Sequence, residues 1–178
     1  MNKYLYGLDL SMECTGITIF DFESLKPVLI MNISTSHFKK SVSHGLKLKY
    51  IEDEFIKMIE KYPPNLIVLE RTFNRFPTAT AVLYKVHGVI NKIFHEYEQI
   101  YYSPKTVKEC IINGSASKQK KKKKIKEKYP NIDFNNDDES DSFAVALTYL
   151  IKNNMLQWEK SSMYSKPIKK SKLIKDKK

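Results

Sequence analysis

Cysteine, histidine and long apolar runs are all scarce in this chain, and each scarcity excludes a class of protein. Only two cysteines occur, Cys14 and Cys110, far apart and without metal spacing. They exclude a disulfide framework and fit a reducing cytosol, so we expect a cytoplasmic protein. The four histidines lack zinc spacing as well. No apolar run reaches the roughly 20 residues of a membrane span, and Asp9 interrupts the N-terminal apolar stretch before a signal peptide can form.

Acidic residues are outnumbered, and the excess positive charge is concentrated in two segments. The 178 residues carry a formal net charge of +11. Residues 118–128 hold eight lysines and one glutamate, and residues 161–178 hold seven lysines and one aspartate. Because these segments account for +7 and +6, the rest of the chain carries −2. A coding bias towards lysine would raise the count without clustering it, so we expect the clusters to bind a polyanion.

Length and apolar content indicate one globular domain followed by a tail. At 178 residues, 42% hydrophobic and 12% aromatic, the chain can bury one sizeable core. We expect this domain to span residues 1–156. Residues 157–178 are lysine-rich and have no periodic pattern, so we expect a disordered tail there.

Hydrophobic periodicity predicts an alternation of strands and helices. Strands are predicted over residues 3–10, 14–22, 26–34, 66–70 and 100–102, and helices over 43–62, 78–97, 104–112, 118–128 and 136–153. Three strands in meander followed by strand–helix alternation predict an α/β fold, a mixed five-stranded sheet with helices on both faces. In that layout the strands that end at Asp9 and Glu70 lie side by side.

Carboxylates stand where the chain leaves or enters these elements. Asp9 and Glu70 each close an apolar strand, and Asp138 and Asp141 begin the last helix. Each acid alone has an ordinary structural explanation, as a strand-end acid bound to a turn N–H or as an acid in the first turn of a helix. Together they can converge on a divalent metal ion, because a buried carboxylate is costly unless a cation neutralises it. Asp137 is an alternative ligand to Asp138.

An acidic cluster in a basic protein points to phosphodiester chemistry. Mg²⁺ prefers carboxylate oxygens and keeps coordination positions for water and phosphate. Two ions about 4 Å apart can activate a water and stabilise the leaving oxygen. Four carboxylates suffice for two Mg²⁺ ions, and Mn²⁺ can substitute.

Five short motifs occur in order along residues 3–152. They are Gly7–Asp9, Thr15–Ile17, Leu69–Phe73, Asn113–Lys118 and Asp138–Ala144. Together they resemble the RuvC family of Holliday-junction resolvases, and the small size and many lysines are similar to phage-borne forms. The resemblance implies an RNase H-like fold, a homodimer and Mg²⁺-dependent paired nicking of four-way DNA junctions. The chain departs from the family where Leu10-Ser11 replaces the usual Pro-Gly after the first aspartate.

The resemblance also implies roles for single residues. The catalytic metal ligands would be Asp9, Glu70, Asp138 and Asp141. Phe73 matches the aromatic that the family inserts at the junction, and Lys108 and Lys118 match basic positions near the scissile phosphate. With the arginines of the loop and the lysine tract, the expected DNA contacts are Phe73, Arg71, Arg75, Lys108, Lys118, Lys120, Lys121, Lys122, Lys123 and Lys124.

Two other functions fit the same residues. A ribonuclease acting on RNA–DNA hybrids would share the fold and the ions. A non-catalytic protein that binds branched DNA would use the acids only as helix and strand caps. Cleavage of a hybrid but not of a junction would select the first, and metal-independent binding without cleavage would select the second.

Overall fold

The computed structural model describes residues 3–71, 77–112 and 117–159. Its elements are β1 (Tyr4–Asp9), β2 (Cys14–Asp21), β3 (Pro27–Ser34), α1 (His44–Lys61), β4 (Pro64–Glu70), α2 (Pro77–Ile93), β5 (Glu98–Tyr102), α3 (Pro104–Ile111), α4 (Lys118–Lys128) and α5 (Asp137–Lys152). Strands and helices follow one another in the predicted order. Of the helices described, none is long and apolar enough to cross a membrane.

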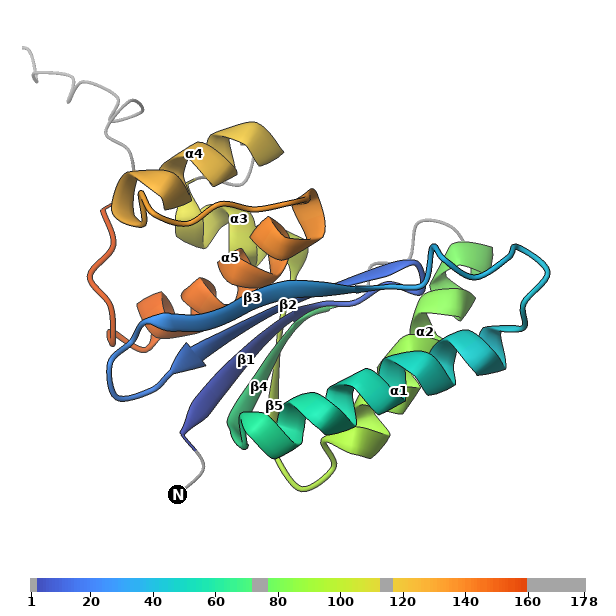
Figure 1. Cartoon of the computed structure of the whole chain (residues 1–178). Coiled ribbons are helices and arrows are strands. Elements are labelled where there is room, and N and C mark those ends of the chain that lie inside the picture. Colours follow the sequence, from blue (N-terminus) through green and yellow to red (C-terminus); the bar gives the residue numbers. More distant parts are fainter. Residues whose placement is uncertain (1–2, 72–76, 113–116, 160–178) are drawn as a thin grey trace, which may run out of the picture.

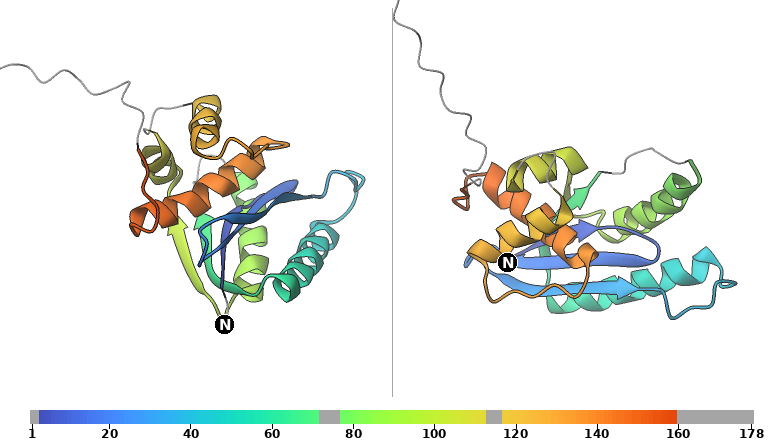
Figure 2. Two further views of the ribbon diagram at one scale, coloured as in Figure 1. Left: turned by 60° about the vertical axis from the view of Figure 1, so that its left-hand side comes forward. Right: turned by 90° about the horizontal axis from the view of Figure 1, so that it is seen from above.

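A single five-stranded sheet forms the centre of the fold, in the order β3-β2-β1-β4-β5. The β1–β2 and β2–β3 pairs are antiparallel, whereas β1–β4 and β4–β5 are parallel. Helices α1 and α2 cover one face, and α3, α4 and α5 lie on the other, as the views in Figure 1 and Figure 2 show. The predicted mixed five-stranded sheet with helices on both faces is confirmed.

The position of β4 inside the sheet explains why its sequence is an unbroken apolar run. Leu66 and Val68 belong to the core under α3 and α5, while Ile67 and Leu69 belong to the core under α1 and α2. A strand covered on both faces has no polar side, so its residues do not alternate. Its neighbour β5 begins at Glu98, which pairs with Leu66, two residues earlier than the sequence predicts.

Short polar side chains set the starts of four helices. Ser43, Ser103, Ser117 and Asn136 are the N-caps of α1, α3, α4 and α5, and each accepts a hydrogen bond from a backbone N–H three residues on. Pro104 follows its cap at the first helical position, where the missing N–H has no cost. The predicted N-cap and proline of α3 are confirmed.

Helix α2 is shorter than predicted. Apolar spacing predicts a helix over 78–97, but α2 ends at Ile93. The Phe94 N–H donates to the Ile90 carbonyl (2.9 Å), and a turn then brings the Tyr97 N–H to the Phe94 carbonyl (3.0 Å). The rings of Phe94 and Tyr97 pack with centroids 6.2 Å apart. The apolar spacing continues beyond the end of the helix because Phe94 and Tyr97 pack against the core although they lie in a turn.

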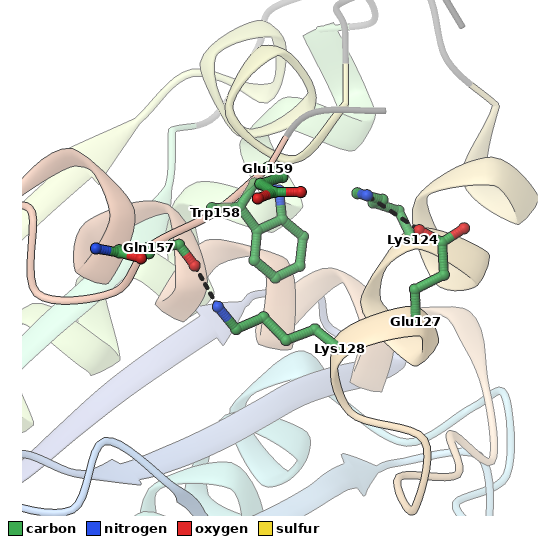
Figure 3. Close-up of a pocket in the computed structure, with 6 residues that line it drawn as sticks. All are labelled: Lys124, Glu127, Lys128, Gln157, Trp158 and Glu159. Atoms are coloured by element: carbon green, nitrogen blue, oxygen red, sulfur yellow. Dashed lines mark hydrogen bonds and ion pairs between the residues drawn. The ribbon is translucent and has the colours of Figure 1, made fainter. Parts of the chain in front are cut away.

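The chain after α5 returns across α3 and α4. Trp158 Nε1 donates to the Ile111 carbonyl at the end of α3 (2.9 Å). Lys128, the last residue of α4, places its Nζ 5.7 Å from the centre of the Trp158 ring and donates to the Gln157 carbonyl. Figure 3 shows these side chains around a pocket of about 330 Å³, which none of the four acids lines. The indole thus ties α3 and α4 together at the end of α4 that is far from Lys118.

Candidate active site

Asp9 and Glu70 end two neighbouring parallel strands. Asp9 is the last residue of β1, and Glu70 is the last residue of β4. The register aligns Leu8 with Leu69, so the next residue of each strand is an acid at the same edge of the sheet. The prediction that these two strands lie side by side is confirmed. Side chains at the carboxyl ends of adjacent parallel strands can share one ligand.

Ser11 organises the turn that leads from β1 into β2. Its Oγ donates to the Cys14 carbonyl (2.8 Å) and accepts from the Cys14 N–H (2.9 Å). Thr15 Oγ1 donates to the Ser11 carbonyl (2.8 Å). These bonds close the turn without a Pro-Gly pair and fix the strand end that carries Asp9.

Helix α5 reaches the same edge because two glycines let it approach the sheet. A Cβ on Gly7 of β1 would lie 2.5 Å from the Ser142 carbonyl oxygen, and a Cβ on Gly16 of β2 would overlap the Asp138 carbonyl. Glycine has no Cβ, so the helix backbone can pack directly on the strands. Gly16 pairs with Asp9 across the sheet, and α5 therefore begins beside the end of β1.

The four acids influence one another electrostatically. Burial, together with the negative charges of Glu70, Asp141 and Asp138, raises the pKa of Asp9 to about 8. Burial also raises the pKa of Glu70, and Asp141 adds to that shift. Carboxylates crowded in a poorly solvated place hold protons until a cation neutralises them. The other three acids that the sequence singles out thus lie near enough to Asp9 to influence its ionisation.

Asp137 and Asp138 have different surroundings. Asp137 is half-exposed, accepts from Lys122 Nζ (2.6 Å) and lies 3.7 Å from Lys118 Nζ. The hydrogen bond from Lys122 lowers the pKa of Asp137. Asp138, in contrast, contributes to the raised pKa of Asp9. Asp138, rather than Asp137, is therefore the residue whose charge acts on Asp9.

Glu139 is a buried carboxylate whose structural role the sequence analysis missed. The residue is 1% exposed. Its Oε1 accepts from Asn32 Nδ2 on β3 (2.9 Å), and its Oε2 accepts from the Asn135 N–H (2.7 Å). The Glu139 N–H in turn donates to the side chain of the N-cap Asn136 (2.9 Å). An acid three residues after an N-cap is the signal of a capping box, and that signal was present in the sequence.

Three lysines border the acids. Lys121 is 6% exposed and donates to Asp141 Oδ1, while Lys118 Nζ lies 3.1 Å from Asp141 Oδ2. Lys108 lines a narrow recess together with Lys118 and Lys121. All three lysines act against the upward shift in the pKa of Glu70. Lys108 and Lys118, for which the family resemblance implies a shared role, thus lie together beside these acids.

The other residues expected to contact DNA lie on α4 and in the loop after β4. Lys120 and Lys123 are exposed, while Lys122 pairs with Asp137 and Lys124 with Glu127. Arg71 is exposed, and its N–H donates to the Tyr102 carbonyl (2.7 Å), which extends the pairing of β4 with β5. Phe73 and Arg75 lie outside the described residues.

The chemistry of the donor set fits a hard divalent cation. Carboxylate oxygens without histidine or thiolate favour Mg²⁺ over zinc. In residues 3–71, 77–112 and 117–159, no three acidic, histidine or cysteine side chains stand close enough to hold a metal ion as they are placed. Lys118 and Lys121 bind the two oxygens of Asp141 instead. These ammonium groups neutralise Asp141, while the pKa values of Asp9 and Glu70 stay raised.

Comparison with known proteins identifies the family. Residues 5–149 match the family model described as crossover junction endodeoxyribonuclease RuvC. The chain belongs to the RuvC family. RuvC proteins are crossover junction endodeoxyribonucleases that resolve Holliday junctions, so the predicted family and enzyme class are confirmed.

Curated relatives and solved structures agree with this assignment. RuvC of Rickettsia typhi is 30% identical over 150 residues, covering 82% of this chain and 95% of that protein. RuvC of Rickettsia bellii is 28% identical over 154 residues, covering 83% and 97%. Thermus thermophilus RuvC, solved with a Holliday junction substrate, superposes with a TM-score of 0.73 at 14% identity over 86% of this chain and 96% of that one. The predicted RNase H-like fold is confirmed, whereas the likeness to phage-borne forms finds no support.

Proposed function

We propose that this RuvC family member resolves junctions by paired, Mg²⁺-dependent nicking at the cluster of Asp9, Glu70, Asp138 and Asp141. The observation that carries the proposal is the meeting of two parallel strand ends and one helix start, each of which supplies acids. The raised pKa of Asp9 supports it, because the crowded carboxylates have an unmet demand for a cation.

In this proposal the carboxylates hold two Mg²⁺ ions per site, and Mn²⁺ can replace them. When bound, the ions supply the Lewis acidity that phosphodiester hydrolysis needs. Lys108 and Lys118, which already lie beside the acids, neutralise charge on the scissile phosphate. Cleavage leaves a 5′-phosphate and a 3′-hydroxyl, which a ligase can rejoin.

We further propose that the enzyme works as a homodimer in the cytoplasm. A four-way junction has approximate two-fold symmetry, so a C₂ dimer presents one site to each of two opposed strands. Structures of Thermus thermophilus RuvC and of a fowlpox virus resolvase contain Holliday junction DNA. The exposed lysines of α4 and Arg71 would contact phosphates, and Phe73 would stack on an unpaired base beside Arg75.

Replacing Asp9 by Asn tests the proposed chemistry. The amide keeps the size of the side chain but removes its charge, so Asp9→Asn should lower nicking of a labelled four-way junction at least about 100-fold while junction binding persists. Asp53→Asn is the matched control, because Asp53 lies on the surface of α1 and pairs with Lys49 (2.9 Å). Full nicking by Asp9→Asn in Mg²⁺ would remove Asp9 from the site.

The choice of substrate separates this proposal from an RNase H-type activity. The purified protein should be offered a four-way junction, a duplex and an RNA–DNA hybrid, each with Mg²⁺ and with EDTA. We expect symmetrical cuts in the junction in Mg²⁺ alone. Cleavage confined to the hybrid would select the ribonuclease instead.

A further inference from the structure

The buried face of α4 contains a lysine. Only two residues of this helix are buried, Ile125 and, one turn earlier, Lys121. Ile125 packs in the core with Val107 and Ile111, as an apolar residue should. Lys121 takes the neighbouring position on the same face at 6% exposure. A buried ammonium is costly unless an opposite charge compensates it, so its partner decides what the residue does.

That partner is one of the four acids. The Lys121 ammonium donates to Oδ1 of Asp141, whose side chain is 13% exposed. The other oxygen of Asp141 faces Lys118, but the Lys118 side chain is 53% exposed and lies on the solvent side of the helix start. Lys121 also acts against the raised pKa values of Asp9 and Glu70. Its charge is therefore felt by three of the four carboxylates.

We propose that Lys121 is a positioning residue that serves as the built-in counter-ion of the acidic cluster. It holds Asp141 while the site contains no metal ion, and it gives up that oxygen when Mg²⁺ binds. The inference rests on the proposed function, because it requires the acids to bind Mg²⁺. Since the ammonium and the metal compete for one oxygen, Lys121 stabilises the metal-free protein and weakens its affinity for Mg²⁺.

The experiment measures Mg²⁺ binding to the full-length protein without DNA, by titration calorimetry, for the wild type and three variants. Lys121→Met has a similar volume, can pack beside Ile125 and lacks the charge, so it should bind Mg²⁺ about tenfold more tightly or better. Lys121→Arg keeps the charge and should stay near the wild type. Lys126→Met removes the same charge from an exposed position paired with Asp133 and should also leave the affinity unchanged.

Thermal unfolding supplies a second readout. In EDTA, Lys121→Met should melt below the wild type, and saturating Mg²⁺ should raise its melting temperature by more than it raises that of the wild type. If Lys121→Met is unfolded in EDTA, folding on addition of Mg²⁺ gives the same support.

Two results would overturn the inference alone. One is a wild type that binds Mg²⁺ together with a Lys121→Met variant of equal or weaker affinity. The other is a Lys121→Met variant that loses its maximal nicking rate at unchanged Mg²⁺ affinity, which would assign Lys121 to the DNA phosphate. A wild type that binds no Mg²⁺ at millimolar concentration would overturn both this inference and the proposed function.

Discussion

Asp9 lowers the stability of the fold that contains it. Its pKa is about 8, far above the ordinary 3.8 of an aspartate. In the unfolded chain the side chain ionises near pH 4, whereas in the folded protein it ionises only near pH 8. Between these values the unfolded chain binds fewer protons, so the free energy of unfolding falls as the pH rises. The raised pKa of Glu70 acts in the same direction.

We therefore expect the metal-free protein to lose stability steadily from about pH 4 to pH 8. Asp9→Asn should have a flatter profile, matching the wild type near pH 4 and exceeding it at pH 8. Urea unfolding in EDTA at several pH values measures the difference. A wild type that gains stability across this window would show that Asp9 ionises normally in the fold.

Glu139 has a different role from the acids on either side of it. Its two oxygens join β3, the loop before α5 and the first turn of α5 through Asn32 and Asn135. Hydrogen bonds to a buried charged group contribute more than neutral ones, and their donors lose a partner when the group is removed. Glu139 thus fixes the helix start that carries Asp138 and Asp141.

Glu139→Ala should destabilise the protein by about 3 kcal/mol, because two part-buried donors are left without an acceptor. Chemical denaturation at neutral pH measures this loss. Asp133→Ala changes an acid of the preceding loop whose side chain is 91% exposed, and it should leave the denaturation midpoint close to that of the wild type. Equal midpoints for the wild type and both variants would show that Glu139 does not stabilise the start of α5.

At the scale of elements, the close contact between α5 and the sheet decides whether the acids meet. The contact depends on Gly7 and Gly16, where any Cβ would run into the backbone of α5. Gly16 is the more informative of the two, because it pairs with Asp9 and a Cβ on it would overlap the Asp138 carbonyl. A methyl group there must push the helix start away from the strand.

Gly16→Ala should therefore lower junction nicking by about 100-fold while the protein stays folded, since a displacement of about 1 Å can cost that much in rate. We expect a loss of stability of about 1–3 kcal/mol from the overpacking. Gly88→Ala in α2 is the matched control, because a Cβ at Gly88 meets nothing within 4 Å. It should stabilise the protein by about 0.5–1 kcal/mol.

The sequence predicts elements well where local chemistry decides them. Serine and asparagine caps mark the starts of α1, α3, α4 and α5 because their side chains bind the first backbone N–H groups. The predicted end of α2 was wrong, because Phe94 and Tyr97 continue the apolar spacing although they lie in a turn. The buried position of Lys121 could not be read from the sequence, since a run of lysines has no hydrophobic period that would distinguish one face of the helix.

At the scale of the whole molecule, the positive charge is concentrated in two segments of the chain. Residues 118–128 carry +7, residues 161–178 carry +6, and the remainder carries −2. Three lysines of α4 are engaged with Asp137 and Asp141, so part of the charge of this helix neutralises neighbouring acids. Residues 161–178 lie outside the described residues, and their share in DNA binding is open to a direct test.

Deleting residues 161–178 should lower the salt dependence of junction binding. Seven lysines leave with this segment, and each phosphate contact contributes about 0.9 to the slope of log K against log salt, so the slope should fall by up to about 6. Binding titrations between 50 and about 200 mM salt measure it. An unchanged slope would mean that the segment does not contact DNA.

The site shows which long-range features a sequence can predict. The adjacency of Asp9 and Glu70 followed from topology, because the order of elements leaves β1 and β4 as parallel neighbours. The convergence of the α5 start with these strand ends was predicted from its acids, but the sequence does not show that Gly7 and Gly16 are what lets the helix come so close. The pairing of Asp141 with Lys121 depends on how α4 packs, which the sequence pattern does not encode.

The acidic cluster joins the ninth residue of the chain to the hundred-and-forty-first. Asp138 and Asp141 are therefore made only after all five strands. If the four acids act together as we propose, a chain that stops before α5 should fold no complete site and should not nick a junction. The proposed activity then has to wait for the synthesis of α5.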